Sequence, residues 1–160
     1  MRILNNMDTR ERDKILMRAA LVCAREGLQA GEIPVGAVVA DQYGNICGAG
    51  RNYVEANFFQ GEHAEVVAIR TASQSRETWR LEGMTLYVTL EPCMMCVSLA
   101  ALSKIERVVF GAYSPRFGAS LDIDGVLRLY RMQIRNITPG VLADEALQVL
   151  RESFMKAREG

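Results

Sequence analysis

The stretch MTLYVTLEPCMMCVSLAALS, at positions 84–103, combines the signals of a β-strand and an α-helix. Its first part, residues 84–90, is rich in apolar, aromatic and β-branched side chains and predicts a strand. Pro92 suits the first position of a helix, where its missing N–H costs nothing, so we expect a helix from there to about Ser103. Another strand is expected at residues 107–111. This alternation indicates a sheet covered by helices.

The rest of the chain extends the alternation in both directions. Asp8 and Glu11 have the spacing of a capping box ahead of an apolar helical repeat. We expect further helices at residues 9–28, 63–75, 121–130 and 141–156, strands at residues 35–40, 46–51 and 132–137, and a loop at residues 52–62. This order predicts an α/β protein, a three-layer α/β/α sandwich with a five-stranded mixed sheet. No linker divides the chain, so residues 1–160 are expected to form a single domain.

Composition is that of an ordinary globular protein. Of the 160 residues, 49% are hydrophobic and 24% are charged, and the net charge is zero, so nothing attracts the whole protein to nucleic acid or to an anionic membrane. Residues 1–13 are polar and contain no apolar stretch typical of a signal peptide or a membrane span. We therefore expect a cytoplasmic protein without membrane contact. Cys23 and Cys47 lie in apolar patterns and are expected to be small core residues.

Two short motifs bring metal-binding residue types together. His63-Ala64-Glu65 begins one predicted helix, and Pro92-Cys93-Met94-Met95-Cys96 begins another. The two cysteines share one face of their helix, and the positive end of the helix dipole favours the thiolate form that a metal needs. Cys-x-x-Cys alone also suits a redox pair or half of a structural zinc site, but a structural site usually has four protein ligands. Since His63 is the only histidine, the set His63, Cys93 and Cys96 predicts a zinc ion with one open, catalytic position.

With these residues placed, the chain resembles the cytidine/deoxycytidylate deaminase superfamily, whose pattern is H-x-E followed by P-C-x-x-C. More specifically, it is similar to bacterial tRNA-specific adenosine deaminases, which convert the wobble adenosine of tRNA to inosine. The resemblance covers nearly the whole chain. Its landmarks are residues 32–38, 50–52, 63–65, 86–93, 107–112 and 140–145.

The resemblance implies a cytidine deaminase-like fold, a homodimer, one Zn²⁺ per subunit and a tRNA anticodon arm as partner. It implies that Asn52 hydrogen-bonds the target nucleoside and that the backbone N–H of Ala64 holds the base. It also implies that Pro34 and Val35 form part of an apolar wall and that Glu91 belongs to the substrate site. Without the resemblance, Asn52 would be interpreted as a turn residue. Pro34 and Val35 would be interpreted as the start of a buried strand.

Glu65 is the carboxylate of the motif that is not needed as a ligand. Most glutamates are simply solvated, but the place of Glu65 in the motif predicts a catalytic role. Zinc lowers the pKa of a bound water from 15.7 toward about 7. Glu65 would take the proton of that water, deliver it to the ring nitrogen of the base, and later to the departing ammonia.

Two segments depart from the pattern of the tRNA branch. Residues 53–62 lack its basic and proline character and carry acidic and aromatic residues instead. Phe58 and Phe59 suit stacking on splayed RNA bases, and they equally suit a dimer interface or the core. Residues 114–121 stand where the family has a glycine-rich loop with a lysine, and Arg116 takes the place of that lysine.

Three other functions remain open at this point. The zero net charge favours a deaminase of a free base or nucleoside, such as guanine or cytosine, because RNA binding depends heavily on phosphate contacts. A non-catalytic zinc subunit could scaffold a partner deaminase, although the presence of Glu65 argues against it. A structural Cys/His module would unfold without metal, whereas a core of this size should persist.

Overall fold

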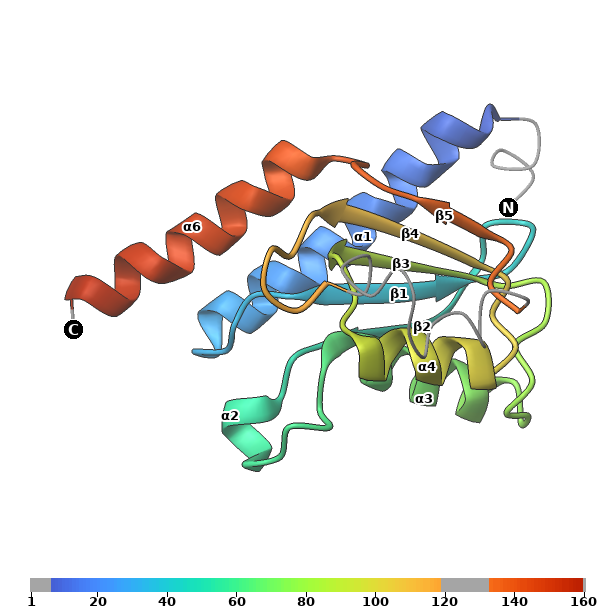
Figure 1. Cartoon of the computed structure of the whole chain (residues 1–160), viewed down its shortest axis with the longest axis horizontal. Coiled ribbons are helices and arrows are strands. Elements are labelled where there is room, and N and C mark those ends of the chain that lie inside the picture. Colours follow the sequence, from blue (N-terminus) through green and yellow to red (C-terminus); the bar gives the residue numbers. More distant parts are fainter. Residues whose placement is uncertain (1–6, 119–132, 160) are drawn as a thin grey trace.

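A five-stranded sheet forms the centre of the protein and carries helices on both faces (Figure 1). The computed structural model describes residues 7–118 and 133–159. The strands lie side by side in the order β2-β1-β3-β4-β5. They are β1 (Gly36–Ala40), β2 (Ile46–Arg51), β3 (Thr85–Leu90), β4 (Arg107–Ala112) and β5 (Asn136–Thr138).

Strand directions in the sheet are mixed, as expected. β1 runs antiparallel to both β2 and β3, whereas β3 and β4 are parallel, as are β4 and β5. The crossover from β3 to β4 contains helix α4 (Met94–Leu102). The strand and helix expected from residues 84–103 therefore form one β-α-β unit, and the helix begins where β3 ends.

Two layers of helices enclose the sheet and confirm the three-layer α/β/α prediction. Helices α1 (Thr9–Gln29) and α6 (Ala143–Glu159) cover one face, and α3 (Ala64–Ser75) and α4 cover the other (Figure 1). Successive residues of a strand point to opposite faces, so the two cores alternate along β1 and β3. Val38 and Tyr87 pack toward α1, whereas Val39, Leu86 and Val88 belong to the cluster under α3 and α4.

Helix α3 lies unusually close to β2 because two glycines of that strand leave room for its backbone. A Cβ atom at Gly48 would lie 2.2 Å from the Ala68 carbonyl oxygen, and one at Gly50 would lie 2.7 Å from the Ala64 carbonyl oxygen. No side chain larger than hydrogen fits at these distances. The glycines therefore set the position of α3, and with it the position of the residues at its amino-terminal end.

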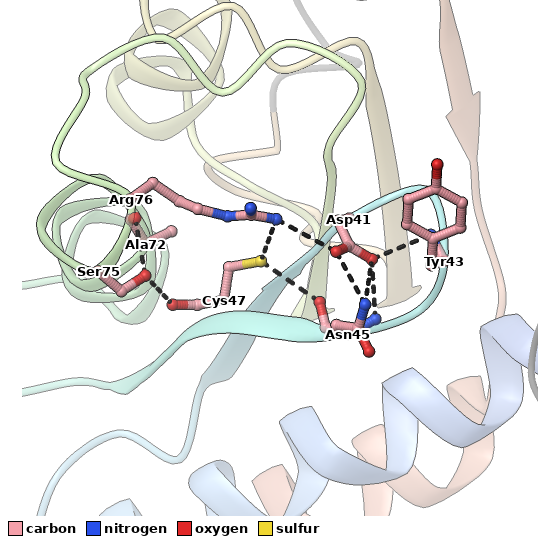
Figure 2. Close-up of polar contacts among 7 residues, drawn as sticks. All are labelled: Asp41, Tyr43, Asn45, Cys47, Ala72, Ser75 and Arg76. Carbon is pink, nitrogen blue, oxygen red and sulfur yellow. Dashed lines mark hydrogen bonds and ion pairs between the residues drawn. The ribbon is translucent and has the colours of Figure 1, made fainter. Parts of the chain in front are cut away.

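A polar network joins the β1–β2 turn to the carboxyl-terminal end of α3 (Figure 2). The Asp41 carboxylate accepts hydrogen bonds of 2.9 Å from the backbone N–H groups of Tyr43 and Asn45, and Arg76 Nη2 lies 3.1 Å from it. The same nitrogen lies 3.3 Å from Cys47 Sγ. Cys47 is half-buried and packs against the core under α3, and Cys23 is half-buried against the core under α1, in agreement with their expected structural roles.

An ion pair between the buried Asp13 and the half-buried Arg107 ties α1 to the start of β4. Arg107 donates two hydrogen bonds to the Asp13 carboxylate, one of them 2.8 Å long from Nη1 to Oδ1. The Tyr87 hydroxyl donates a third, at 2.9 Å, and burial next to Asp13 raises the pKa of Tyr87. This cluster lies at the amino-terminal end of β4, away from the start of α4.

The structure corrects one expected helix start and one expected helix cap. Pro92 is not the first residue of α4: Cys93 is the N-cap, with an extended backbone that forms a β-bridge with Gly118, and the helix begins one residue later. The capping box at the start of α1 is also wrong. Asp8 is the N-cap, but its side chain makes no capping hydrogen bond, and Glu11 pairs with Lys14 at 2.7 Å.

Other expected segments differ in extent. The expected loop at residues 52–62 contains a short helix, α2 (Val54–Asn57), which stands away from the body of the protein (Figure 1). The last strand is β5, shorter than expected, and α6 begins at Ala143. The helix expected at residues 121–130 lies outside the described residues. Within the part of the chain that the structure describes, no helix is long and apolar enough to cross a membrane.

Candidate active site

The three predicted metal ligands meet where two helices begin on the same face of the sheet. His63 is the N-cap of α3, Cys93 is the N-cap of α4, and Cys96 lies in the first turn of α4. One ligand atom from each residue lies within 4.8 Å of the other two. Both N-cap residues have extended backbones, so their side chains leave the helices at the ends rather than along the sides.

The distances between these atoms fit a zinc ion. His63 Nδ1 lies 3.7 Å from Cys93 Sγ and 3.5 Å from Cys96 Sγ. A tetrahedral zinc with a nitrogen at about 2.0–2.1 Å and a sulfur at about 2.3 Å holds those two atoms about 3.6 Å apart. The residues present therefore match zinc in chemical type and in spacing, with Nδ1 as the ligand atom of His63.

Protonation in the cluster is shared between the two thiols. Hydrogen bonding from Cys96, assisted by His63, lowers the pKa of the Cys93 thiol to about 4. The neighbouring Cys93 thiolate and burial raise the pKa of Cys96, and contact with Cys93 raises the pKa of His63. One ligand is therefore already a thiolate, whereas Cys96 must release a proton when a metal binds.

Glu65 lies in the first turn of α3 and lines the same cavity as His63 and Cys93. It is only 4% exposed, and burial raises the pKa of its carboxyl, with the imidazole of His63 opposing part of that rise. In the described part of the chain, the His, Cys, Asp and Glu side chains close enough to share a metal ion are three, His63, Cys93 and Cys96. Glu65 is not among them. With three protein ligands, a zinc ion bound here would accept one non-protein ligand, in the cavity that the buried Glu65 also lines.

A cavity of about 340 Å³ opens onto this cluster. Apolar side chains dominate its wall, and polar groups are placed at a few points, as is typical of small-ligand sites. Besides His63, Glu65 and Cys93, it is lined by Ile33, Val35, Asn52, Gln60, Leu90, Glu91, Met95, Ser114 and Phe117.

The residues expected to bind substrate divide into two groups. Val35, Asn52 and Glu91 line the cavity, whereas Pro34 is fully buried and lines it nowhere. Ala64 is also buried, and its N–H donates a 2.9 Å hydrogen bond to Asn52 Oδ1. A role for that N–H in holding a base would require the bond to Asn52 to be exchanged.

Asn52 and Glu91 each connect separate segments of the wall. Asn52 Nδ2 donates to the Ile33 carbonyl at 3.0 Å, so this side chain links the segment that precedes β1 to the start of α3. The buried Glu91 carboxylate accepts the Ser114 N–H at 3.0 Å. Both residues shape the cavity in addition to any contact with substrate.

Sequence reasoning missed several residues of the cavity wall. The amide end of Gln60 lies 3.5 Å from Nε2 of His63, the nitrogen that carries hydrogen when Nδ1 binds a metal. Met95, Ser114 and Phe117 complete the wall. Gln60 stands three positions before His63, so its nearness in sequence was the one available signal.

Comparison with known proteins places these features in a family. The sequence pattern that describes the cytidine and deoxycytidylate deaminase zinc-binding region matches residues 10–112. A protein named tRNA-specific adenosine deaminase from Haemophilus influenzae is 41% identical, with 93% of this chain and 87% of that protein covered. The protein of the same name from Bacillus subtilis is 38% identical, with 92% and 91% covered. A tRNA(Ile)-lysidine synthase from Deinococcus deserti is 43% identical over 89% of this chain, which spans only 27% of that protein.

Solved structures agree in fold. One, from work on A-to-I editing by tRNA:A34 deaminases at the wobble position of transfer RNA, superposes with a TM-score of 0.74 and 31% identity, covering 84% of this chain and 98% of that one. Another, a guanine deaminase from Nitrosomonas europaea, has a TM-score of 0.78 and 25% identity, covering 88% and 83%. By the zinc-binding pattern, the ligand geometry and these relatives, the chain belongs to the cytidine and deoxycytidylate deaminase family.

Proposed function

We propose that this protein hydrolyses the exocyclic amine of the wobble adenosine in a tRNA anticodon arm, giving inosine and ammonia. The observation that carries the proposal is a buried carboxyl group, Glu65, in one cavity with a three-residue zinc site. The choice of adenosine in tRNA is supported by similarity to tRNA-specific adenosine deaminases over 92–93% of the chain.

The proposed chemistry assigns one role to each group of the site. His63, Cys93 and Cys96 hold the zinc ion, which when bound supplies the Lewis acidity that makes water a nucleophile near neutral pH. Glu65 takes a proton from the attacking water and donates it to the ring nitrogen next to the amine-bearing carbon. As the C–N bond breaks, Glu65 transfers the second water proton to the departing amine, so that water and adenosine become inosine and ammonia.

The wall of the cavity suits a flat base. Ile33, Val35 and Leu90 supply apolar contacts, and Asn52 supplies a polar group. The base must leave the anticodon loop to reach this site, which costs little where it is already unpaired.

Guanine deamination is the second candidate function, and a specific observation favours it. The guanine deaminase structure superposes with a TM-score of 0.78, and the chain has no net positive charge to attract RNA. The experiment is therefore to offer the zinc-loaded protein an anticodon stem-loop, adenosine, guanine and cytosine side by side and to measure ammonia release. Release from the stem-loop alone supports the proposal. Turnover of free guanine without turnover of the stem-loop would replace it by the second candidate.

We also infer a cytoplasmic homodimer. A tRNA substrate supports the location. The dimer is supported by three exposed apolar side chains on α4, which are Met94, Met95 and Leu102. Leu102→Glu should give a monomer in light scattering, and Val22→Glu, an equally exposed apolar position on α1, should leave the dimer intact. A monomeric wild-type protein would contradict this part of the proposal.

A further inference from the structure

Two adjacent phenylalanines after α2 are displayed to solvent. Phe58 is 94% exposed and Phe59 is 62% exposed. Phe58 also has a φ of +51°, the left-handed conformation, which costs energy for a bulky residue. The placement excludes a role in the core of this chain, one of the roles that the sequence left open.

The segment that carries them is held firmly to the protein. The buried carboxylate of Glu32 accepts hydrogen bonds from the N–H groups of Glu55 and Ala56, at 3.1 and 2.9 Å, at the first turn of α2. The Tyr53 N–H donates to the Glu62 carbonyl at 3.0 Å and closes the base of the segment. The two rings are therefore exposed on a segment that is hydrogen-bonded to the rest of the protein.

The segment that carries Phe58 and Phe59 adjoins the mouth of the active-site cavity. Gln60, next to Phe59, lines the cavity and reaches Nε2 of His63. Two other lining residues, Ile33 and Phe117, are 59% and 74% exposed. Exposed apolar side chains thus surround the route by which a substrate enters. The Phe59 ring lies against the backbone of Gly61, where a Cβ atom would come within 2.3 Å of it.

The charge of the segment favours contact with the bases of a nucleic acid over contact with its phosphate groups. Residues 53–62 contain no Lys, Arg or His and so offer no cation to a phosphate group. Of their two acidic residues, Glu55 is exposed, and Glu62 is engaged by Arg70 at 2.9 Å. Aromatic rings instead stack on the faces of unpaired bases, a contact worth about 1–3 kcal/mol per base that does not need charge. Bases on either side of a flipped target nucleotide are unpaired and lie at the cavity mouth when the target is inside.

We propose that Phe58 and Phe59 form a stacking platform for the unpaired bases that flank the target nucleotide, an inference that rests on the proposed activity on tRNA. In this assignment, affinity for RNA comes to a large extent from stacking, which fits a chain without net positive charge. The platform separates a polynucleotide substrate from a free base, because a free base has no neighbours to stack.

The test uses the zinc-loaded protein and an anticodon stem-loop with 2-aminopurine next to the target adenosine. Stacking on Phe58 or Phe59 should change the 2-aminopurine fluorescence on binding. The double variant Phe58→Ala/Phe59→Ala should lose that change and raise KM roughly 5- to 150-fold for each base that loses its stacking contact, with kcat little altered. Phe58→Trp should preserve both. Trp79→Ala removes an exposed aromatic beyond the other end of α3 and should behave as wild type.

Each outcome decides between defined conclusions. Wild-type protein that leaves the stem-loop unreacted refutes the proposed function and this inference with it. Wild-type protein that deaminates the stem-loop, with an unchanged KM and fluorescence signal in the double variant, refutes the inference alone. A double variant that loses dimerisation in light scattering assigns the two rings to a contact with a second copy of the chain and also overturns the inference.

Discussion

Replacement of Gly50 by alanine should disturb the metal site from the opposite side of α3. The new Cβ atom would lie 2.7 Å from the Ala64 carbonyl oxygen, the Ala68 nitrogen and the Val67 Cβ, all on α3. Ordinary contact for such an atom begins at 3.4 Å, so the helix must retreat from β2 by about 0.7 Å. Because His63 is the N-cap of α3, it must move with the helix.

The two cysteines do not move with α3, because they belong to α4. The spacing of 3.5–3.7 Å between His63 Nδ1 and the two sulfurs would change by more than the roughly 0.2 Å that a metal site tolerates. We expect zinc affinity to fall at least about tenfold and the free energy of unfolding to fall by about 1–3 kcal/mol from overpacking.

Competition with a chromogenic zinc chelator measures the affinity, and urea unfolding followed by circular dichroism measures the stability. Gly27→Ala is the matched control, because a Cβ atom at Gly27 meets nothing closer than 3.8 Å inside α1. That variant should keep its zinc affinity and gain up to about 1 kcal/mol of stability. Wild-type zinc affinity in Gly50→Ala would refute the argument that this close approach positions His63.

Four further predictions concern the site and the fold. Glu65→Gln should keep zinc, as judged by metal analysis, and lose about 10²–10⁴-fold in kcat; loss of the metal would show that Glu65 was misassigned. Cys93→Ala should lose zinc after dialysis, and full occupancy would contradict the ligand set. Because zinc must displace the proton of Cys96, whose pKa is raised, chelator competition should show affinity falling at least about tenfold per unit as pH decreases; a flat profile would mean that Cys96 is not a ligand. Asp13→Asn should leave the half-buried Arg107 without its anionic partner and lower the free energy of unfolding by about 1–3 kcal/mol, while zinc content stays normal; an unchanged urea midpoint would contradict the importance of this pair.

The expectations that proved correct share a physical basis. Alternating apolar residues and the helical repeat predict strands and helices because they depend on contacts only a few residues apart. The ligand set His63, Cys93 and Cys96 was predictable for a similar reason: the two cysteines lie three residues apart, at the N-cap and in the first turn of one helix, and the chain offers a single histidine. The expectations that failed concern single helix ends: at Pro92 the β-bridge of Cys93 accompanies a later helix start, and at Asp8 the helix begins where expected but Glu11 pairs with Lys14 instead of completing a capping box.

The amino-acid sequence by itself determined the kind of chemistry, because the elements that bear the zinc ligands and Glu65 are set by local patterns. The tertiary structure alone decided how the cavity is built around them. Glu32 accepts a hydrogen bond from Glu55 of α2, 23 residues away, and Glu91 accepts one from Ser114, also 23 residues away. These contacts join residues far apart in the sequence, as does the close approach of α3 to β2 that the glycines of β2 permit, and no short-range pattern encodes them. The chemistry could thus be inferred from residue types and spacing, whereas the shape of the entrance, and the exposure of Phe58 beside it, required the folded chain.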